Sequence, residues 1–142
     1  MATEKNKWID AAGKLLQLTQ DGKLEWKPRD PPAYLNLEPD RKRVEVVYEA
    51  KYKDRKLRLY QLSYKVERPR NSLSAFKDLA AYVNPPDYPY WTRKTVLELL
   101  DQSGFGAWTF PETEVLDDLL TAVRYQAAGV REFLNEILAV AS

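Results

Sequence analysis

The spacing Glu49-Ala50-Lys51 places a carboxylate and an ammonium group on one side of a predicted strand. A carboxylate in such a position can hold Mg²⁺ while a lysine stabilises developing negative charge, which is the chemistry of metal-dependent phosphodiester cleavage. A site of this kind also needs an acidic residue on the neighbouring strand, and the candidates Asp40 and Glu45 are poorly placed. An alternating Glu/Lys strand face exposed to water explains the spacing more simply, and we favour that interpretation.

A second acidic group, Glu114, Asp117 and Asp118, could be taken for metal ligands. Adjacent residues on a helix point in different directions, so Asp117 and Asp118 do not converge on one ion. Negative charge that compensates a helix N-terminus is the better explanation. We therefore predict no metal site.

The chain contains neither histidine nor cysteine. This removes the commonest general base and metal ligand, all catalytic arrangements that depend on histidine or cysteine, and every disulfide. We therefore predict no catalytic residue, no cofactor and no enzymatic activity.

Basic and aromatic side chains alternate along the predicted hairpin 43–66. Such a mixture can bind single-stranded nucleic acid, with cations on phosphates and aromatic rings on bases. It can equally be a half-buried sheet whose edge is protected by Lys and Arg. The residues of the nucleic-acid alternative are Tyr48, Lys51, Tyr52, Arg55, Lys56, Arg58, Tyr60 and Tyr64.

Two proline-rich loops, 28–40 and 84–91, carry exposed aromatic candidates. Rigid aromatic loops suit protein recognition because little conformational entropy is lost on docking. The alternative is that these rings cap the core of the domain. The partner-binding candidates are Tyr34, Tyr88, Tyr90 and Trp91.

Length and charge limit the number of domains and the kinds of partner to expect. A chain of 142 residues with 44% hydrophobic residues fits one globular domain, residues 1–142. Residues 41–70 hold 11 basic and 4 acidic residues, net +7, whereas residues 98–142 hold 2 and 8, net −6. The basic middle and acidic end can attract each other within the fold or face different partners. We find no secretion signal or membrane span and expect a cytoplasmic, bacterial protein.

The segment 112–140 organises the predicted fold. Leu116, Val123, Val130 and Ile137 repeat every seven residues, which predicts one long amphipathic helix, bent at Gly129 at most. Its apolar stripe is broader than a strict coiled-coil seam, which favours packing on a sheet, although dimerisation through part of it is an alternative.

The remaining elements are shorter. We predict a first helix over 7–20 that ends at Gly22, a strand over 23–27 stopped by Pro28, and a proline-rich loop lying against the body. Strands 43–52 and 56–66 form a hairpin, and a change of parity between Leu59 and Tyr60 predicts a β-bulge. A short helix over 72–83 and a second hairpin, 94–101 with 107–110, precede the C-terminal helix.

The order of these elements predicts an α+β fold. An antiparallel sheet of four to five strands, with the N-terminal helix and the long C-terminal helix packed on one face, is the simplest way to bury the apolar positions.

The run from Lys14 to Trp26 is similar to the opening of a loose group of small uncharacterised bacterial α+β proteins. Those proteins continue with a Tyr-rich hairpin, here Tyr48 to Tyr64, and close with a helix like 119–134. The resemblance covers most of the chain, although the proline-rich loops are longer here. It implies the fold and no defined activity.

From these observations we expect a non-enzymatic module that binds another protein in the bacterial cytosol, as an accessory, immunity-type or defence-associated subunit. A homodimer is one form of that partnership. The alternative is a nucleic-acid-binding module that uses the hairpin 43–66.

Overall fold

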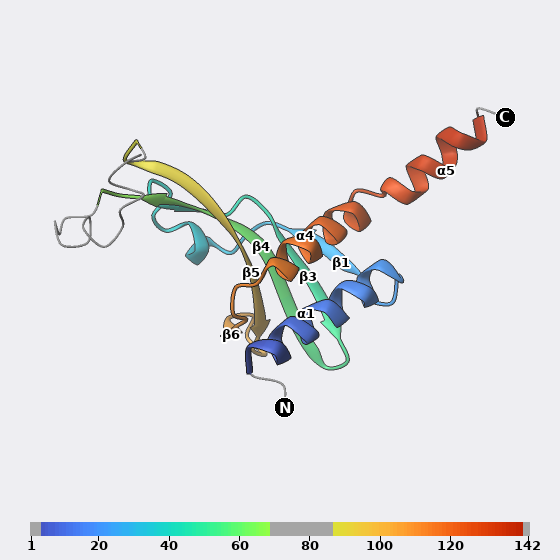
Figure 1. Cartoon of the computed structure of the whole chain (residues 1–142), viewed down its shortest axis with the longest axis horizontal. Coiled ribbons are helices and arrows are strands. Elements are labelled where there is room, and N and C mark those ends of the chain that lie inside the picture. Colours follow the sequence, from blue (N-terminus) through green and yellow to red (C-terminus); the bar gives the residue numbers. More distant parts are fainter. Residues whose placement is uncertain (1–3, 69–86, 141–142) are drawn as a thin grey trace.

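The computed structural model describes residues 4–68 and 87–140 and has an α+β fold (Figure 1). The order of elements begins and ends with helices, and the strands lie between them. The helices are α1 (Glu4–Gln20), α4 (Glu114–Ala127) and α5 (Val130–Val140), with a short 3-10 helix η1 (Ala33–Asn36). The strands are β1 (Trp26–Arg29), β2 (Lys42–Arg43), β3 (Val47–Tyr52), β4 (Arg55–Val66), β5 (Tyr90–Leu100) and β6 (Gly106–Thr109). The predicted helix 72–83 lies outside the described residues.

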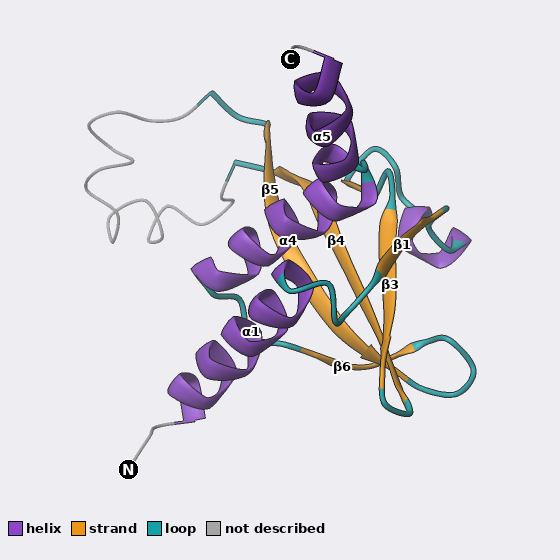
Figure 2. Cartoon of the chain, turned by 90° about the vertical axis from the view of Figure 1, so that its right-hand side faces the viewer, coloured by secondary structure: helices purple, strands orange, loops and turns teal. Residues whose placement is uncertain are grey.

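The sheet has six antiparallel strands in the order β1-β3-β4-β5-β6, with β2 pairing β4 beyond the end of β3. The helices α1 and α4 lie on one side of it (Figure 2). We call this side the helix face; it carries Ala50, Leu59 and Leu97. The opposite side, the loop face, carries Val47, Tyr60 and Val96. The predicted fold class is confirmed, with one strand more than expected.

The main core lies between the helix face and the two helices. Its buried members come from α1, from the loop that follows α1, from the sheet and from α4. They are Ala12, Leu15, Leu24, Trp26, Ala50, Leu57, Leu59, Leu97, Leu116, Leu119, Leu120 and Val123. The predicted stripe of α4 therefore packs on the sheet as expected.

The loop between α1 and β1 is fixed by polar contacts to both helices. Gly22 has φ +75°, the left-handed conformation expected where α1 ends. The Trp26 Nε1–H donates to Thr19 Oγ1 at 2.9 Å, and the Gln126 amide of α4 accepts from the Trp26 backbone N–H at 2.7 Å. The same amide donates to the Leu24 carbonyl at 2.9 Å. Gln126 thus ties α4 to the start of the sheet.

Strand β1 differs from the prediction because it continues through Pro28 to Arg29. Pro28 pairs with Tyr48 of β3, and β1 is an edge strand of the sheet. Proline is tolerated at an edge, where its missing N–H costs no hydrogen bond within the sheet.

The predicted strand 43–52 is interrupted. Its residues divide between β2 and β3, and the segment 44–46 leaves the ladder. Asn36 of η1 pairs both polar groups of Val44: its amide donates to the Val44 carbonyl at 2.9 Å and accepts from the Val44 N–H at 2.8 Å. The Asn36 side chain therefore replaces a neighbouring strand at this position, and Val44 turns into the loop-face core with Val47.

The predicted β-bulge near Leu59 and Tyr60 is absent, because β4 pairs in continuous register with both β3 and β5. The change of parity has another cause. All four residues 57–60 are buried, Leu57 and Leu59 under the helices and Arg58 and Tyr60 under η1 and the turn after β5. The described irregularity instead lies in β5, between Leu99 and Leu100 opposite β6.

The second predicted hairpin is confirmed as β5 and β6, although β5 begins at Tyr90, inside the predicted loop 84–91. The first hairpin turns at Lys53 and Asp54, between Tyr52 and Arg55, and Lys53 has φ +55°. The proline-rich loop 28–40 lies against the body as expected, since Leu35 of η1 packs on the loop-face core.

The C-terminal segment is two helices rather than one. Gly129 has φ +68°, and its N–H donates to the Gln126 carbonyl, which ends α4. The Phe133 N–H then bonds the Gly129 carbonyl as α5 begins. Figure 1 shows α5 extending away from the sheet, so only the α4 half of the predicted stripe covers it. None of the helices in the described residues is long and apolar enough to cross a membrane.

Candidate interaction surfaces

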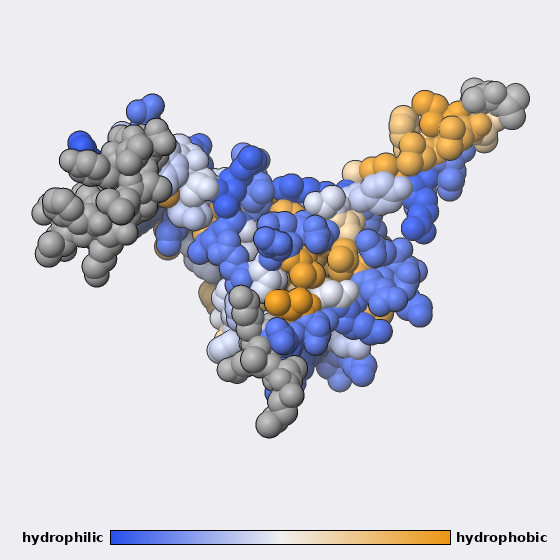
Figure 3. Space-filling model, in the orientation of Figure 1, coloured by the Kyte–Doolittle hydropathy of each residue, from blue (hydrophilic) through white to orange (hydrophobic). Residues whose placement is uncertain are grey.

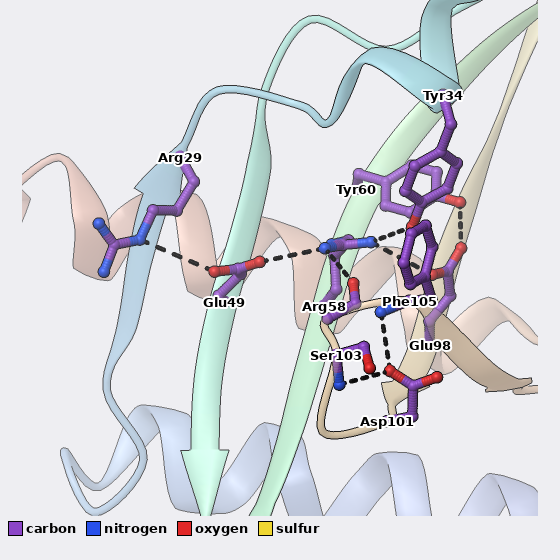
Figure 4. Close-up of polar contacts among 10 residues, drawn as sticks. Arg29, Tyr34, Glu49, Arg58, Tyr60, Glu98, Asp101, Ser103 and Phe105 are labelled. Carbon is purple, nitrogen blue, oxygen red and sulfur yellow. Dashed lines mark hydrogen bonds and ion pairs between the residues drawn. The ribbon is translucent and has the colours of Figure 1, made fainter.

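A buried polar network on the loop face centres on Arg58 of β4 (Figure 4). Its guanidinium donates to the Tyr34 hydroxyl at 2.6 Å and to the Gly104 carbonyl at 2.9 Å. The same group pairs with Glu49 at 3.4 Å and lies 3.8 Å from Glu98. The Arg58 side chain is only 4% exposed. Three segments far apart in sequence therefore meet on one cation.

Glu98 of β5 completes the network. Its carboxylate accepts a short hydrogen bond from the Tyr60 hydroxyl, while Oε2, the oxygen nearest Arg58, has no hydrogen-bond partner among the described residues. Burial, followed by this bond to Glu98, raises the pKa of Tyr60 far above its usual value. A Cβ atom at Gly106 would lie 2.7 Å from Oε2, so the adjacent backbone of β6 leaves no room for a side chain. Through Tyr34 and the Gly104 carbonyl, the network holds η1 and the turn 101–105 on the sheet.

Glu49 of the Glu49-x-Lys51 spacing is paired with basic side chains. Glu49 lies between two arginines, with Arg29 at 3.7 Å and Arg58 at 3.4 Å, so its charge is already paired. Among the described residues, no group of three or more acidic side chains could hold a metal ion. Asp117 accepts a hydrogen bond from Thr95 Oγ1 at 2.5 Å, which joins α4 to β5.

The predicted nucleic-acid set is spread over the whole hairpin. Arg58 and Tyr60 are buried in the polar network, and Tyr48 packs against the main core. The remaining cations and Tyr52 are exposed around the Lys53 turn, whereas Tyr64 lies near the other end of β4. A strand advances about 3.4 Å per residue, so Lys56 and Tyr64 are about 27 Å apart. The structure does not bring these eight residues to one surface.

The predicted partner-binding aromatics lie at three separate places. Tyr34 lies beside Phe105, with ring centroids 5.3 Å apart, above the Arg58 network. Tyr88 and Tyr90 contact each other at 5.5 Å at the start of β5. Trp91 points to the helix face and is 40% exposed, with the Arg43 guanidinium 4.2 Å from its ring centroid.

A large apolar surface lies exposed on α5, whereas the interpretation favoured from the sequence packs this part of the stripe on the sheet. Its side chains follow the spacing i, i+3, i+4, i+7, i+8 and leave four large apolar groups uncovered. We call these the α5 stripe: Phe133, Leu134, Ile137 and Leu138, which are 58%, 41%, 51% and 68% exposed. Figure 3 shows the apolar surface along the projecting helix. In the sequence, Gly129 was the available signal that the helix could end before the stripe does. A residue that adopts positive φ can end a helix while the apolar spacing continues unchanged.

A groove of about 840 Å³ lies beside the first turn of α5. It runs between the end of α1 and α4, and its lining includes Leu16, Ala122 and Tyr125. Arg131 crosses one end, donating to the Gln20 carbonyl at 3.4 Å. From α5 the groove is lined by Arg131 and Glu132 and by none of the four residues of the α5 stripe, so the two are separate surfaces.

Comparison with protein families, with curated proteins and with solved structures finds no match to this chain. Functional inference therefore depends on the surfaces themselves.

Proposed function

We propose that this protein is a non-enzymatic protein-interaction module whose docking element is α5. The observation that supports it is the α5 stripe, four large apolar side chains exposed together on a helix that leaves the body of the domain. An amphipathic helix that presents anchors at i, i+1, i+4 and i+5 fits a hydrophobic groove on a partner. Contiguous exposed apolar surface of this kind marks an interaction site in a folded protein.

The charges around the stripe indicate the chemistry of the partner. Arg131 is directed to the Gln20 carbonyl of α1, whereas Glu132 and Glu136 remain exposed on α5. The region 98–142 is acidic overall, with 8 acidic and 2 basic residues, net −6. A partner that complements this helix has an apolar groove with a basic rim. As an accessory subunit of the bacterial cytosol, the module would recruit or occupy that partner rather than transform a substrate.

A pair of matched variants tests the proposal. Ile137→Asp places a charge in the stripe, and Asn135→Asp adds the same charge two residues away, on the polar side of α5. Both side chains are exposed, so each variant should retain the stability of the wild type to within about 0.5 kcal/mol. In affinity capture from the native host, a stoichiometric protein should be retained by the wild type and by Asn135→Asp and lost with Ile137→Asp.

Two outcomes would contradict the proposal. Equal capture by Ile137→Asp and Asn135→Asp would show that the stripe is not the docking element. A loss of several kcal/mol of stability in Ile137→Asp alone, with the protein monomeric by light scattering, would show that the stripe is buried within the domain. Light scattering of the wild type at increasing concentration separates a second copy from a different partner.

A further inference from the structure

A basic surface with one exposed tryptophan lies on the helix face beyond the part that α4 covers. Cross-strand pairing places Arg43, Ser63 and Arg93 in one row and Lys65 with Trp91 in the next. Arg124 of α4 donates to Gln61 Oε1 at 3.3 Å in the neighbouring row and lines a small pocket with Ser63 and Arg93. We call this the Trp91 patch: Arg43, Lys65, Trp91, Arg93 and Arg124.

The cations of the Trp91 patch are available to a ligand. In the part of the chain that the structure describes, none of the four has a carboxylate within 4.0 Å, although Glu45 lines the same small pocket as Arg93 and Arg124. This differs from Arg58, whose charge is paired and buried. Three cations on adjacent rows of the sheet and Arg124 of α4, none of them in an ion pair among the described residues, produce a local positive potential in a chain whose net charge is only +1.

Trp91 adds a stacking surface to that charge. Its ring is 40% exposed although the Arg43 guanidinium lies over it at 4.2 Å. Stacking on an exposed ring beside phosphate-binding cations is how proteins bind single strands without strong sequence preference. On the loop face of the same strands, Lys94 lies over the Tyr64 ring at 5.5 Å, which repeats the pairing of cation and aromatic ring.

We propose that the Trp91 patch binds single-stranded nucleic acid, with Trp91 stacking on a base and the surrounding arginines and lysine contacting phosphates. This inference is independent of the proposed role of α5, because the two surfaces share no residue. An acidic protein segment would satisfy the cations and would leave Trp91 without a planar partner. The proposed ligand is therefore a single strand, and the experiment below distinguishes RNA from DNA.

The test is fluorescence anisotropy with labelled 20-nucleotide oligo(dT) and oligo(U) at several salt concentrations. Arg43→Ala with Arg93→Ala should weaken binding at least tenfold and flatten the salt dependence, since each lost phosphate contact lowers the log–log slope by about 0.7. Trp91→Ala should weaken binding roughly tenfold with little change in that slope, because it removes stacking rather than charge. The melting temperature of each variant verifies that the domain is folded.

The matched control is Lys51→Ala with Lys56→Ala, which removes the same charge at the opposite end of β4. These two lysines line a separate groove of about 460 Å³ with Lys27 and Arg29, and they should leave the affinity within about twofold of the wild type. A larger loss in this control would overturn the assignment by locating binding at the other end of the hairpin. Absence of binding at low salt would overturn it as well. Equal affinity for a duplex of the same length, or equal competition by poly-glutamate, would overturn the role of base stacking.

Discussion

Breaking the buried pair of Arg58 and Glu98 is predicted to be the most costly single change on the loop face. Glu98→Gln keeps the size of the side chain and an acceptor for Tyr60 and removes the negative charge. Arg58, 4% exposed, would then retain a single carboxylate partner, Glu49, whose side chain is 34% exposed. Removing one partner of a fully buried pair costs about 3–5 kcal/mol. Since Glu49, Tyr34 and Gly104 remain as partners, we expect Glu98→Gln to lose about 2–3 kcal/mol.

A double-mutant cycle measured by urea unfolding at pH 7 tests this reasoning. Arg58→Met should cost a similar amount because it leaves Glu98 buried without a cation. The combination of Arg58→Met and Glu98→Gln should cost at least 1 kcal/mol less than the sum of the two single changes, since no uncompensated charge remains in this pair. Additive costs, or a loss below about 0.5 kcal/mol in Glu98→Gln, would refute the view that this pair holds η1 and the turn 101–105 on the sheet.

Four further substitutions test Tyr60 of the same network and the helices. The raised pKa of Tyr60 means that its neutral form is favoured in the folded state, so this stability is present below about pH 10 and is lost as the pH rises further; Tyr60→Phe should flatten that alkaline decline in thermal unfolding. Gly129→Ala should destabilise by about 1 kcal/mol because φ is +68°, whereas Gly13→Ala, inside α1 with nothing within 4 Å of the added Cβ, should stabilise by a similar amount in urea unfolding. Gln126→Ala removes hydrogen bonds to Trp26 and Leu24 and should cost about 2 kcal/mol, with faster amide exchange at Trp26 as the local measure.

Local features of the fold were predictable from the sequence. The end of α1 at Gly22 and the hairpin around Lys53 depend on residues close in the chain, and both predictions are confirmed. The two-sided burial of β4 was not predictable in this way. It depends on contacts between Arg58 and Tyr34, 24 residues before it, and Gly104, 46 residues after it. A run of buried residues on both faces therefore produced the same signal as a bulge.

For the candidate surfaces, too, the residue types were predictable from the sequence, whereas the contacts between distant segments were not. Trp91 was identified from its type and its loop, but its cations Arg43 and Arg93 meet it only through the pairing of β2, β4 and β5. The α5 stripe was identified as apolar, and packing on the sheet was favoured over dimerisation, because a helical pattern does not reveal whether the surface that covers it lies within the same chain. The positive φ of Gly129 separates α5 from α4 and leaves the stripe uncovered. The apolar spacing of the sequence does not reveal that conformation.

The most direct test of the account is photo-crosslinking from α5 in the native host, with benzoylphenylalanine in place of Phe133 and, in a second variant, in place of Asn135. The account predicts one specific crosslinked protein from position 133 and little or none from position 135, because only the first side chain belongs to the α5 stripe. No crosslink from position 133, or crosslinks of equal strength from both positions, would contradict the claim that α5 is the docking element.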